Sequence, residues 1–237
     1  MTVRARPPES GAEKQSSQPP GGLVTLHIPA ALWDRQYAAD LLRRYWSTLP
    51  DGTPAYTGSH FERLGGGGDR REVRNRFTAE DFLAVATLSV TLPARAALQV
   101  LAPHDPHHYT RLLTAIPADI ELADADEEHV AEDGPAWTLW RALREVHGIG
   151  PVGAGKLLAR KRPRLLPVHD AVVKKVFARP TSDLTFWSDV RTQLRNDKGA
   201  LVSHLEETRN LSGIGNDISV LRVLDAAAWM HGKELGH

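Results

Sequence analysis

Residues 146–170 read VHGIGPVGAGKLLARKRPRLLPVHD, and this stretch decides the fold. A helical pattern, WTLWRALREV, leads into it from Trp137, and a second apolar periodic run, through Leu157 and Leu158, follows Gly148-Ile149-Gly150. Apolar residues three and four positions apart are typical of a helix that buries one face. The stretch therefore predicts two helices joined by a glycine turn, a hairpin that spans residues 137–161.

The glycines of this turn suit it to anion binding. Because glycine has no Cβ, the backbone can bend sharply and a large anion can approach the bare N–H groups. The N–H groups in the first turn of the next helix have no partner in that helix and carry the positive end of its dipole. The turn is therefore suited to bind a phosphate group.

The spacing of these residues resembles a known family. Val146, Gly148, Gly150, Ala154 and Leu158 occur in the order apolar, glycine, glycine, alanine, apolar, and the pattern is similar to the helix-hairpin-helix of the endonuclease-III-like DNA glycosylase superfamily. In that superfamily an aspartate follows the second glycine by about twenty residues and opens the next helix. Asp170 stands at the same separation here. The resemblance covers about 25 residues of the 237 in the chain.

The resemblance implies a DNA partner and a reaction. It implies backbone contacts to duplex DNA around the hairpin and hydrolysis of the N-glycosidic bond of a damaged or modified base, with Asp170 as the catalytic carboxylate. Val152 stands where family members that also cut the strand have a lysine, which implies a monofunctional enzyme with water as the nucleophile. The residues expected at the DNA phosphates are Gly148, Gly150, Val152, Lys156, Arg160 and Lys161.

Composition excludes several classes of site. The chain has no cysteine, and so no disulfide, no zinc thiolate site and no cysteine-ligated iron-sulfur cluster such as several members of the resembled superfamily carry. We expect no cofactor. The N-terminal residues do not form a signal peptide and no apolar run is long enough for a membrane span, so we expect a cytoplasmic protein that does not contact a membrane.

Charge is unevenly distributed although the net charge is zero. Residues 118–134 contain eight acidic residues and no Lys or Arg, whereas residues 137–179 contain ten basic residues and two acidic ones. The concentration of positive charge around the hairpin is what phosphate binding requires. Solvated helix faces would have the same composition.

The rest of the chain predicts an all-α protein. Residues 1–22 are rich in Pro, Ser, Gly and Gln and are expected to be a disordered tail. Residues 23–237 are expected to form one multi-helix globular domain, DNA-glycosylase-like and containing the hairpin. Helices are expected after Pro29, after the capping sequence Thr78–Asp81 and after Pro93. A buried closing helix is expected over residues 217–230.

Three alternatives remain open at this stage. Asp170 is a suitable helix N-cap whether or not it is catalytic. The hairpin could belong to a non-catalytic DNA-binding or structural module, and a second Gly-Ile-Gly at 213–215 fits either a second hairpin or a helix stop. Residues 150–156 also resemble a phosphate loop of nucleotide-binding enzymes, but Leu157 stands where a Ser or Thr would bind magnesium, and the preceding segment is predicted to be helical.

Two further groups of side chains are candidates for binding. His104, Asp105, His107 and His108 are residue types that ligate first-row metals, although a solvated turn between helices explains them equally well. Five aromatic residues could stack on an extruded base, although aromatic residues at helical spacing belong more often to a core. These residues are Tyr56, Phe61, Trp137, Trp140 and Trp187.

Overall fold

The computed structural model describes residues 26–168, 170–180 and 184–237, and in these residues the regular structure is helical apart from an isolated bridge between Thr48 and Pro54. The predicted all-α class is confirmed at this level, whereas the tail predicted at 1–22 lies outside the described residues. The α-helices are α1 (Arg35–Tyr45), α2 (Ala79–Thr87), α3 (Ala94–Leu101), α4 (His108–Thr114), α5 (Pro135–Arg144), α6 (Pro151–Lys161), α7 (Ala171–Val176), α8 (Phe186–Arg195), α9 (Ala200–Ser212) and α10 (Val220–Glu234). In these described ranges, every helix is too short or too polar to cross a bilayer.

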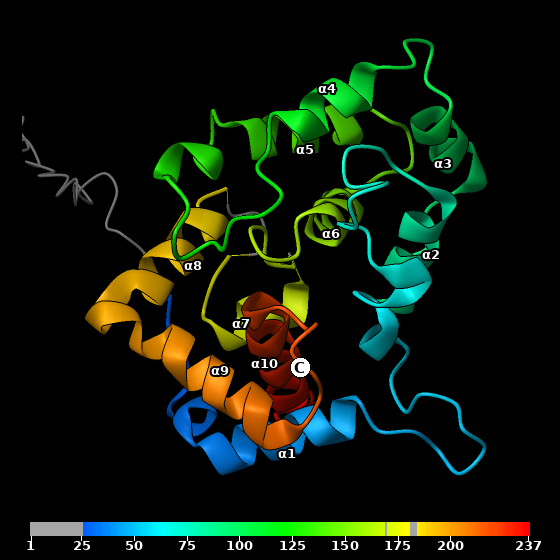
Figure 1. The fold of residues 1–237 in the computed structure, drawn as a ribbon. Coiled ribbons are helices and arrows are strands. Elements are labelled where there is room, and N and C mark those ends of the chain that lie inside the picture. Colours follow the sequence, from blue (N-terminus) through cyan, green and yellow to red (C-terminus); the bar gives the residue numbers. More distant parts are fainter. Residues whose placement is uncertain (1–25, 169, 181–183) are drawn as a thin grey trace, which may run out of the picture.

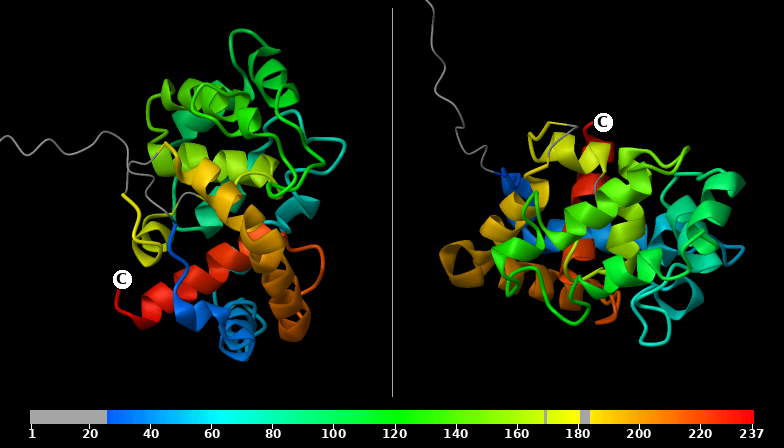
Figure 2. Two further views of the ribbon diagram at one scale, coloured as in Figure 1. Left: turned by 90° about the vertical axis from the view of Figure 1, so that its left-hand side faces the viewer. Right: turned by 90° about the horizontal axis from the view of Figure 1, so that it is seen from above.

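The helices form two halves (Figures 1 and 2). In the terminal half, α10 packs against α1, α7 and α9, while α9 also packs against α1 and α8. In the middle half, α6 packs against α2 and α5, and α3 and α4 lie outside these. The two ends of the described chain therefore meet in one half, and the chain passes to the other half after α1 and returns after α6.

Local sequence accounts for the helix ends. Thr78 and Asp81 form the predicted capping box at the start of α2, and α3 begins directly after Pro93. Gly213 has a φ of 73° and is the C-cap of α9. The second Gly-Ile-Gly therefore begins with the residue that ends this helix. The last helix begins later than predicted, at Val220, because the Ser219 hydroxyl accepts a hydrogen bond from the backbone N–H of Arg222 at 3.1 Å.

The acidic segment at 118–134 is part of the folded body rather than a free linker. Leu122, Ala125 and Val130 are buried, and the only helical turn in the segment is Glu127–His129. Cations of other elements hold its backbone, since Arg191 Nε on α8 donates to the Ala125 carbonyl at 2.6 Å. Its carboxylates remain at the surface while its apolar residues complete the core.

Candidate functional site

The glycine turn between α5 and α6 lies at the surface. Gly148 and Gly150 are exposed, and Ile149 between them is buried and anchors the turn. Gly148 has a φ of 95°, and a Cβ there would lie 2.9 Å from Pro93 Cγ at the start of α3. A Cβ at Gly150 would meet nothing within 4 Å. The turn is therefore supported on one side and open to a ligand on the other.

The open side of the turn leads to the first turn of α6. Gly150 is the N-cap with φ −78° and ψ 175°, and Pro151 follows as the first helical residue. The N–H groups of Val152 and Gly153 belong to this first turn and have no partner within their own helix. Val152 also lines a pocket, so the first turn of α6 borders that pocket.

The pocket lies between the two halves of the molecule and has a volume of about 550 Å³. The middle half contributes Val152 and Lys156 of α6 together with residues 87–90, and the terminal half contributes α1, α10 and the start of α7. The side chains that matter for its chemistry are Tyr45, Tyr56, Lys156, Asp170, Arg222, Asp225 and Trp229. Residues more than 180 positions apart are brought together here, which no local sequence pattern indicates.

Asp170 is the predicted N-cap, and its carboxylate also lines the pocket. Its Oδ1 accepts a hydrogen bond from Val172 N at 2.9 Å, so it is the N-cap of α7. Its Oδ2 lies 3.2 Å from Lys156 Nζ, its side chain is 19% exposed, and it lines the pocket. The carboxylate is therefore held in place by two groups and still faces an open space.

Lys156, predicted at a DNA phosphate, lies beside Asp170 instead, and its side chain is only 3% exposed. Its Nζ donates to the Leu88 carbonyl at 2.9 Å in addition to pairing with Asp170. Burial lowers the pKa of Lys156 from its ordinary value, and the neighbouring Asp170 carboxylate opposes this shift. Lys156 is thus a pocket residue and not a surface contact for a phosphate.

The lowered pKa of Lys156 predicts a pH-dependent stability difference between the wild type and Lys156→Met. In the unfolded chain the lysine pKa is about 10.4, so below that pH the unfolded state binds more protons and stability rises with pH. The free energy of unfolding of the wild type should therefore increase relative to that of the variant between about pH 7 and pH 9.5, the range below tyrosine ionisation. Urea unfolding at both pH values measures this, and a difference that does not change with pH would contradict it.

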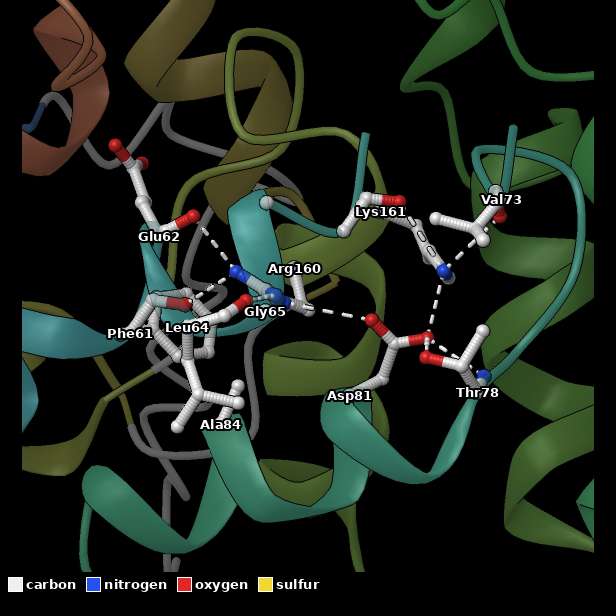
Figure 3. A network of polar contacts seen from close by, with 12 residues as sticks. Phe61, Glu62, Leu64, Gly65, Val73, Thr78, Asp81, Ala84, Arg160 and Lys161 are labelled. Carbon is white, nitrogen blue, oxygen red and sulfur yellow. Dashed lines mark hydrogen bonds and ion pairs between the residues drawn. The ribbon is translucent and has the colours of Figure 1, made fainter. Parts of the chain in front are cut away.

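Arg160 and Lys161, predicted at DNA phosphates, are 1% and 0% exposed. Figure 3 shows their network: Lys161 Nζ lies 2.6 Å from Asp81 Oδ2, and Arg160 donates to the carbonyl oxygens of Phe61 and Glu62 at 2.6 and 2.7 Å. Burial lowers the pKa of both cations, and the nearby Asp81 carboxylate opposes the shift. These side chains hold the segment after Phe61 on α6 and have no surface from which to contact DNA.

The phosphate-loop alternative does not agree with the structure. Residues 151–161 form α6, so Gly153 and Gly155 lie inside a helix and do not form a loop around a phosphate. The element before the turn is helix α5, whereas the phosphate loop follows a strand. Lys156 is bound to internal partners. A nucleotide-binding site at 150–156 is therefore excluded.

Most of the pocket's aromatic and polar residues were not singled out from the sequence. Tyr45 and Tyr56 stack with ring centroids 5.4 Å apart, and Trp229 meets both rings edge-on at 5.9 and 5.7 Å. Of the five aromatic residues proposed for stacking, only Tyr56 lines this pocket, and Trp137 and Trp187 stack on each other in the core. The available signal was in α10, where Arg222 and Asp225 interrupt an otherwise apolar helix.

The histidine cluster does not form a metal site in the structure. The Asp105 carboxylate accepts from His107 N at 2.9 Å and pairs with Arg111, so it closes a turn. Across the part of the chain that the structure describes, no three His, Asp or Glu side chains gather closely enough to hold a metal ion.

A second pocket, of about 450 Å³, lies between the acidic segment and helices α8 and α9. Two of its cations are bound to protein groups: Arg164 Nη1 donates to Glu121 Oε1 at 2.5 Å and Arg195 Nη1 to the Ala123 carbonyl at 3.2 Å. None of the predicted site residues lines it. The pocket that contains Asp170 is therefore the better candidate.

A family model matches residues 38–232, which is most of the chain. The chain belongs to DUF6308, a family of unknown function. The range that matches DUF6308 contains the glycine turn and every residue that lines the Asp170 pocket except Lys233. No curated protein and no solved structure matches the chain. The function of this DUF6308 member is therefore argued from its own site.

Proposed function

We propose that this protein binds duplex DNA and hydrolyses the N-glycosidic bond of a damaged or modified base. The observation that carries the proposal is the position of Asp170, whose carboxylate is held in the wall of an open pocket next to an exposed glycine turn. A glycosylase of the resembled superfamily needs this combination, because one element must grip the backbone and a carboxylate must face the sugar.

Hydrolysis of the N-glycosidic bond requires a fixed negative charge beside the sugar. Cleavage of an N-glycosidic bond passes through a transition state that resembles an oxocarbenium ion, which a carboxylate stabilises. In this proposal the Asp170 carboxylate faces C1′ of the sugar and orients the attacking water. Lys156 is a positioning residue: its cation, 3.2 Å away, and the Val172 N–H keep the carboxylate in one orientation.

The pocket suits an extruded base. An enzyme that acts on the glycosidic bond within a duplex must turn the nucleotide out of the stack. A volume of about 550 Å³ lies within the range of small-molecule sites, and the rings of Tyr56 and Trp229 offer flat apolar faces for stacking.

The DNA backbone contact is assigned to the glycine turn and to exposed cations near it. Gly148 packs against Pro93 and Ala96, and Arg95 is an exposed cation on the same helix. Arg144, at the end of α5, is also exposed, and its guanidinium lies 5.0 Å from the centre of the Trp140 ring. These residues take the place of the buried Arg160 and Lys161 in the predicted DNA contact.

Gly150→Ala tests the backbone contact without disturbing the fold. Alanine readily adopts the φ of −78° at this position, and its methyl group meets nothing within 4 Å. We expect stability within about 0.5 kcal/mol of the wild type. The methyl group would stand between the N–H groups and a phosphate, so duplex affinity should fall roughly tenfold, about 1.4 kcal/mol.

Gly148→Ala is the contrasting variant. Its φ of 95° and the contact with Pro93 predict a loss of stability in addition to any loss of affinity. Fluorescence anisotropy with a labelled duplex and thermal melting separate the two effects. Unchanged duplex binding by Gly150→Ala would remove the glycine turn from the proposed interface.

Base release from a panel of duplexes, each carrying one damaged or modified base, tests the enzymatic proposal. Release of a free base with formation of an abasic site is the expected result. Borohydride treatment during the reaction should trap no covalent adduct, because water is the proposed nucleophile. Trapping that disappears in Lys156→Met would instead assign the nucleophile to the Lys156 amine.

A non-catalytic DNA-binding protein is the second candidate. The observation that favours it is that both Asp170 oxygens already have protein partners, as a purely structural carboxylate would. Salt-dependent duplex binding without release of any base in the panel would establish this second candidate.

A further inference from the structure

A buried polar cluster forms one wall of the Asp170 pocket. Tyr45, Arg222 and Asp225 are 4%, 4% and 5% exposed, and all three line the pocket. The Arg222 guanidinium joins the other two: Nη1 donates to Asp225 Oδ2 and Nη2 donates to the Tyr45 hydroxyl oxygen. Nη2 also donates to the Gly58 carbonyl at 2.9 Å. The rigid guanidinium of Arg222 thereby fixes the positions of Tyr45 and Asp225 relative to each other.

After the hydrogen bonds within this cluster are made, one hydrogen-bond donor and one acceptor remain for a ligand. The Tyr45 hydroxyl accepts from Arg222, so its own hydrogen remains to be donated. Asp225 is bound through Oδ2 to Arg222, and Oδ1 retains its lone pairs. Both residues line the pocket, so an O–H donor and a carboxylate acceptor that are joined through Arg222 belong to one wall.

We infer that the pocket selects bases whose edge carries a carbonyl oxygen beside a ring N–H, as in hypoxanthine, guanine and uracil. This inference rests on the proposed function and names its substrate class. The carbonyl oxygen accepts from the Tyr45 hydroxyl, and the ring N–H donates to Asp225 Oδ1. The Tyr56 and Trp229 rings are nearly perpendicular, at 81°, so one of them stacks on a face of the base, and such stacking does not discriminate between edges.

Bases with an amino edge have the opposite order of groups. Adenine and cytosine carry an amino group beside an unprotonated ring nitrogen. Bound in the same orientation, the ring nitrogen would face the Asp225 carboxylate, and two acceptors would meet in a buried wall. A site that leaves buried polar groups unpaired with the wrong ligand discriminates strongly.

Binding of 2′-deoxynucleosides, each named here by its base, to the full chain tests the inference. A free base could turn over and reverse the order of the groups on its edge, whereas the sugar of a nucleoside must lie beside Asp170 and fixes the orientation. Hypoxanthine and adenine are a matched pair, because they have the same ring system and differ at this edge, and uracil and cytosine form a second pair. Calorimetric titration should show tighter binding of hypoxanthine than of adenine by about 10- to 100-fold. Equal affinities within both pairs would overturn the inference.

Two variants assign the selection to particular groups. Tyr45→Phe and Asp225→Asn should each reduce the hypoxanthine preference, and Asp225→Asn should raise the affinity for adenine because an amide also donates. Tyr56→Phe is the matched control and should keep the preference, since no hydrogen bond of its hydroxyl contributes to the cluster. Preference that persists in both Tyr45→Phe and Asp225→Asn would overturn the assignment. Circular dichroism checks that each variant is folded. If Asp225→Asn does not fold, the base preference of Tyr45→Phe alone tests the assignment.

Failure of this inference is distinguishable from failure of the proposed function. Nucleoside binding needs neither duplex DNA nor cleavage of the glycosidic bond. Selective binding of hypoxanthine without release from any duplex would support the inference and remove the enzymatic proposal. Equal rates of release from duplexes that carry deoxyinosine and deoxyadenosine would overturn the inference and support the enzyme.

Discussion

Asp170→Asn is expected to lower base release by about 10²- to 10³-fold, the size of effect seen when one preorganised electrostatic group is removed from an active site. Asparagine has nearly the same shape and remains a good N-cap, so α7 should keep its start. The substitution removes the negative charge that stabilises the developing positive charge on the sugar. The measurement is the single-turnover rate of base release, on the duplex from which the wild type releases its base fastest.

Two controls make the Asp170→Asn result specific. Duplex affinity should stay within a factor of two or three of the wild type, since the Gly148–Gly150 turn and its exposed neighbours are untouched. Asp170→Ala, which removes the cap and leaves the buried Lys156 without its counter-ion, should cost more in stability than the roughly 1 kcal/mol of a lost cap. Full activity of Asp170→Asn would show that Asp170 is only a helix cap.

Asp81→Ala is expected to have the largest effect on stability, about 3–5 kcal/mol, because it leaves buried cations without their counter-ion. Asp81 is 0% exposed and pairs with Lys161 at 2.6 Å and with Arg160 at 3.4 Å. It also accepts from the Thr78 backbone N–H at 2.8 Å, so the same substitution removes half of the capping box of α2. The free energy of unfolding in urea is the measurement.

The matched control is an ion pair at the surface. Asp119 pairs with Arg74 at 2.7 Å, with its side chain 79% exposed, and Asp119→Ala should cost no more than about 1 kcal/mol. If Asp81→Ala cost no more than Asp119→Ala, the carbonyl oxygens around Arg160 and Lys161 would be sufficient to hold these cations.

The local features of this chain were predictable from its sequence, because they depend on neighbours within a few residues. The capping box at Thr78, the start of α3 after Pro93 and the end of α9 at Gly213 follow from backbone sterics and from side chains that bond to nearby N–H groups. The helix was predicted to start at residue 217, whereas α10 starts at Val220. The sequence does not show which neighbouring residue caps the helix, because that depends on tertiary contacts. Ser219, the actual cap, is held by Glu62 at 2.6 Å, from a segment 157 residues away.

Spacing and residue type along the chain were enough to predict the helical class, the glycine turn between α5 and α6 and the N-cap at Asp170. The direction in which the basic residues of α6 point depends on how the helices pack. Helix α6 lies between α2 and α5, so Lys156, Arg160 and Lys161 are buried although a surface helix would have the same composition. The pocket is likewise a tertiary product, since Tyr45 and Trp229 come from opposite ends of the chain. The physical reason is that periodicity depends on spacing along one helix, whereas burial depends on which other helices cover it.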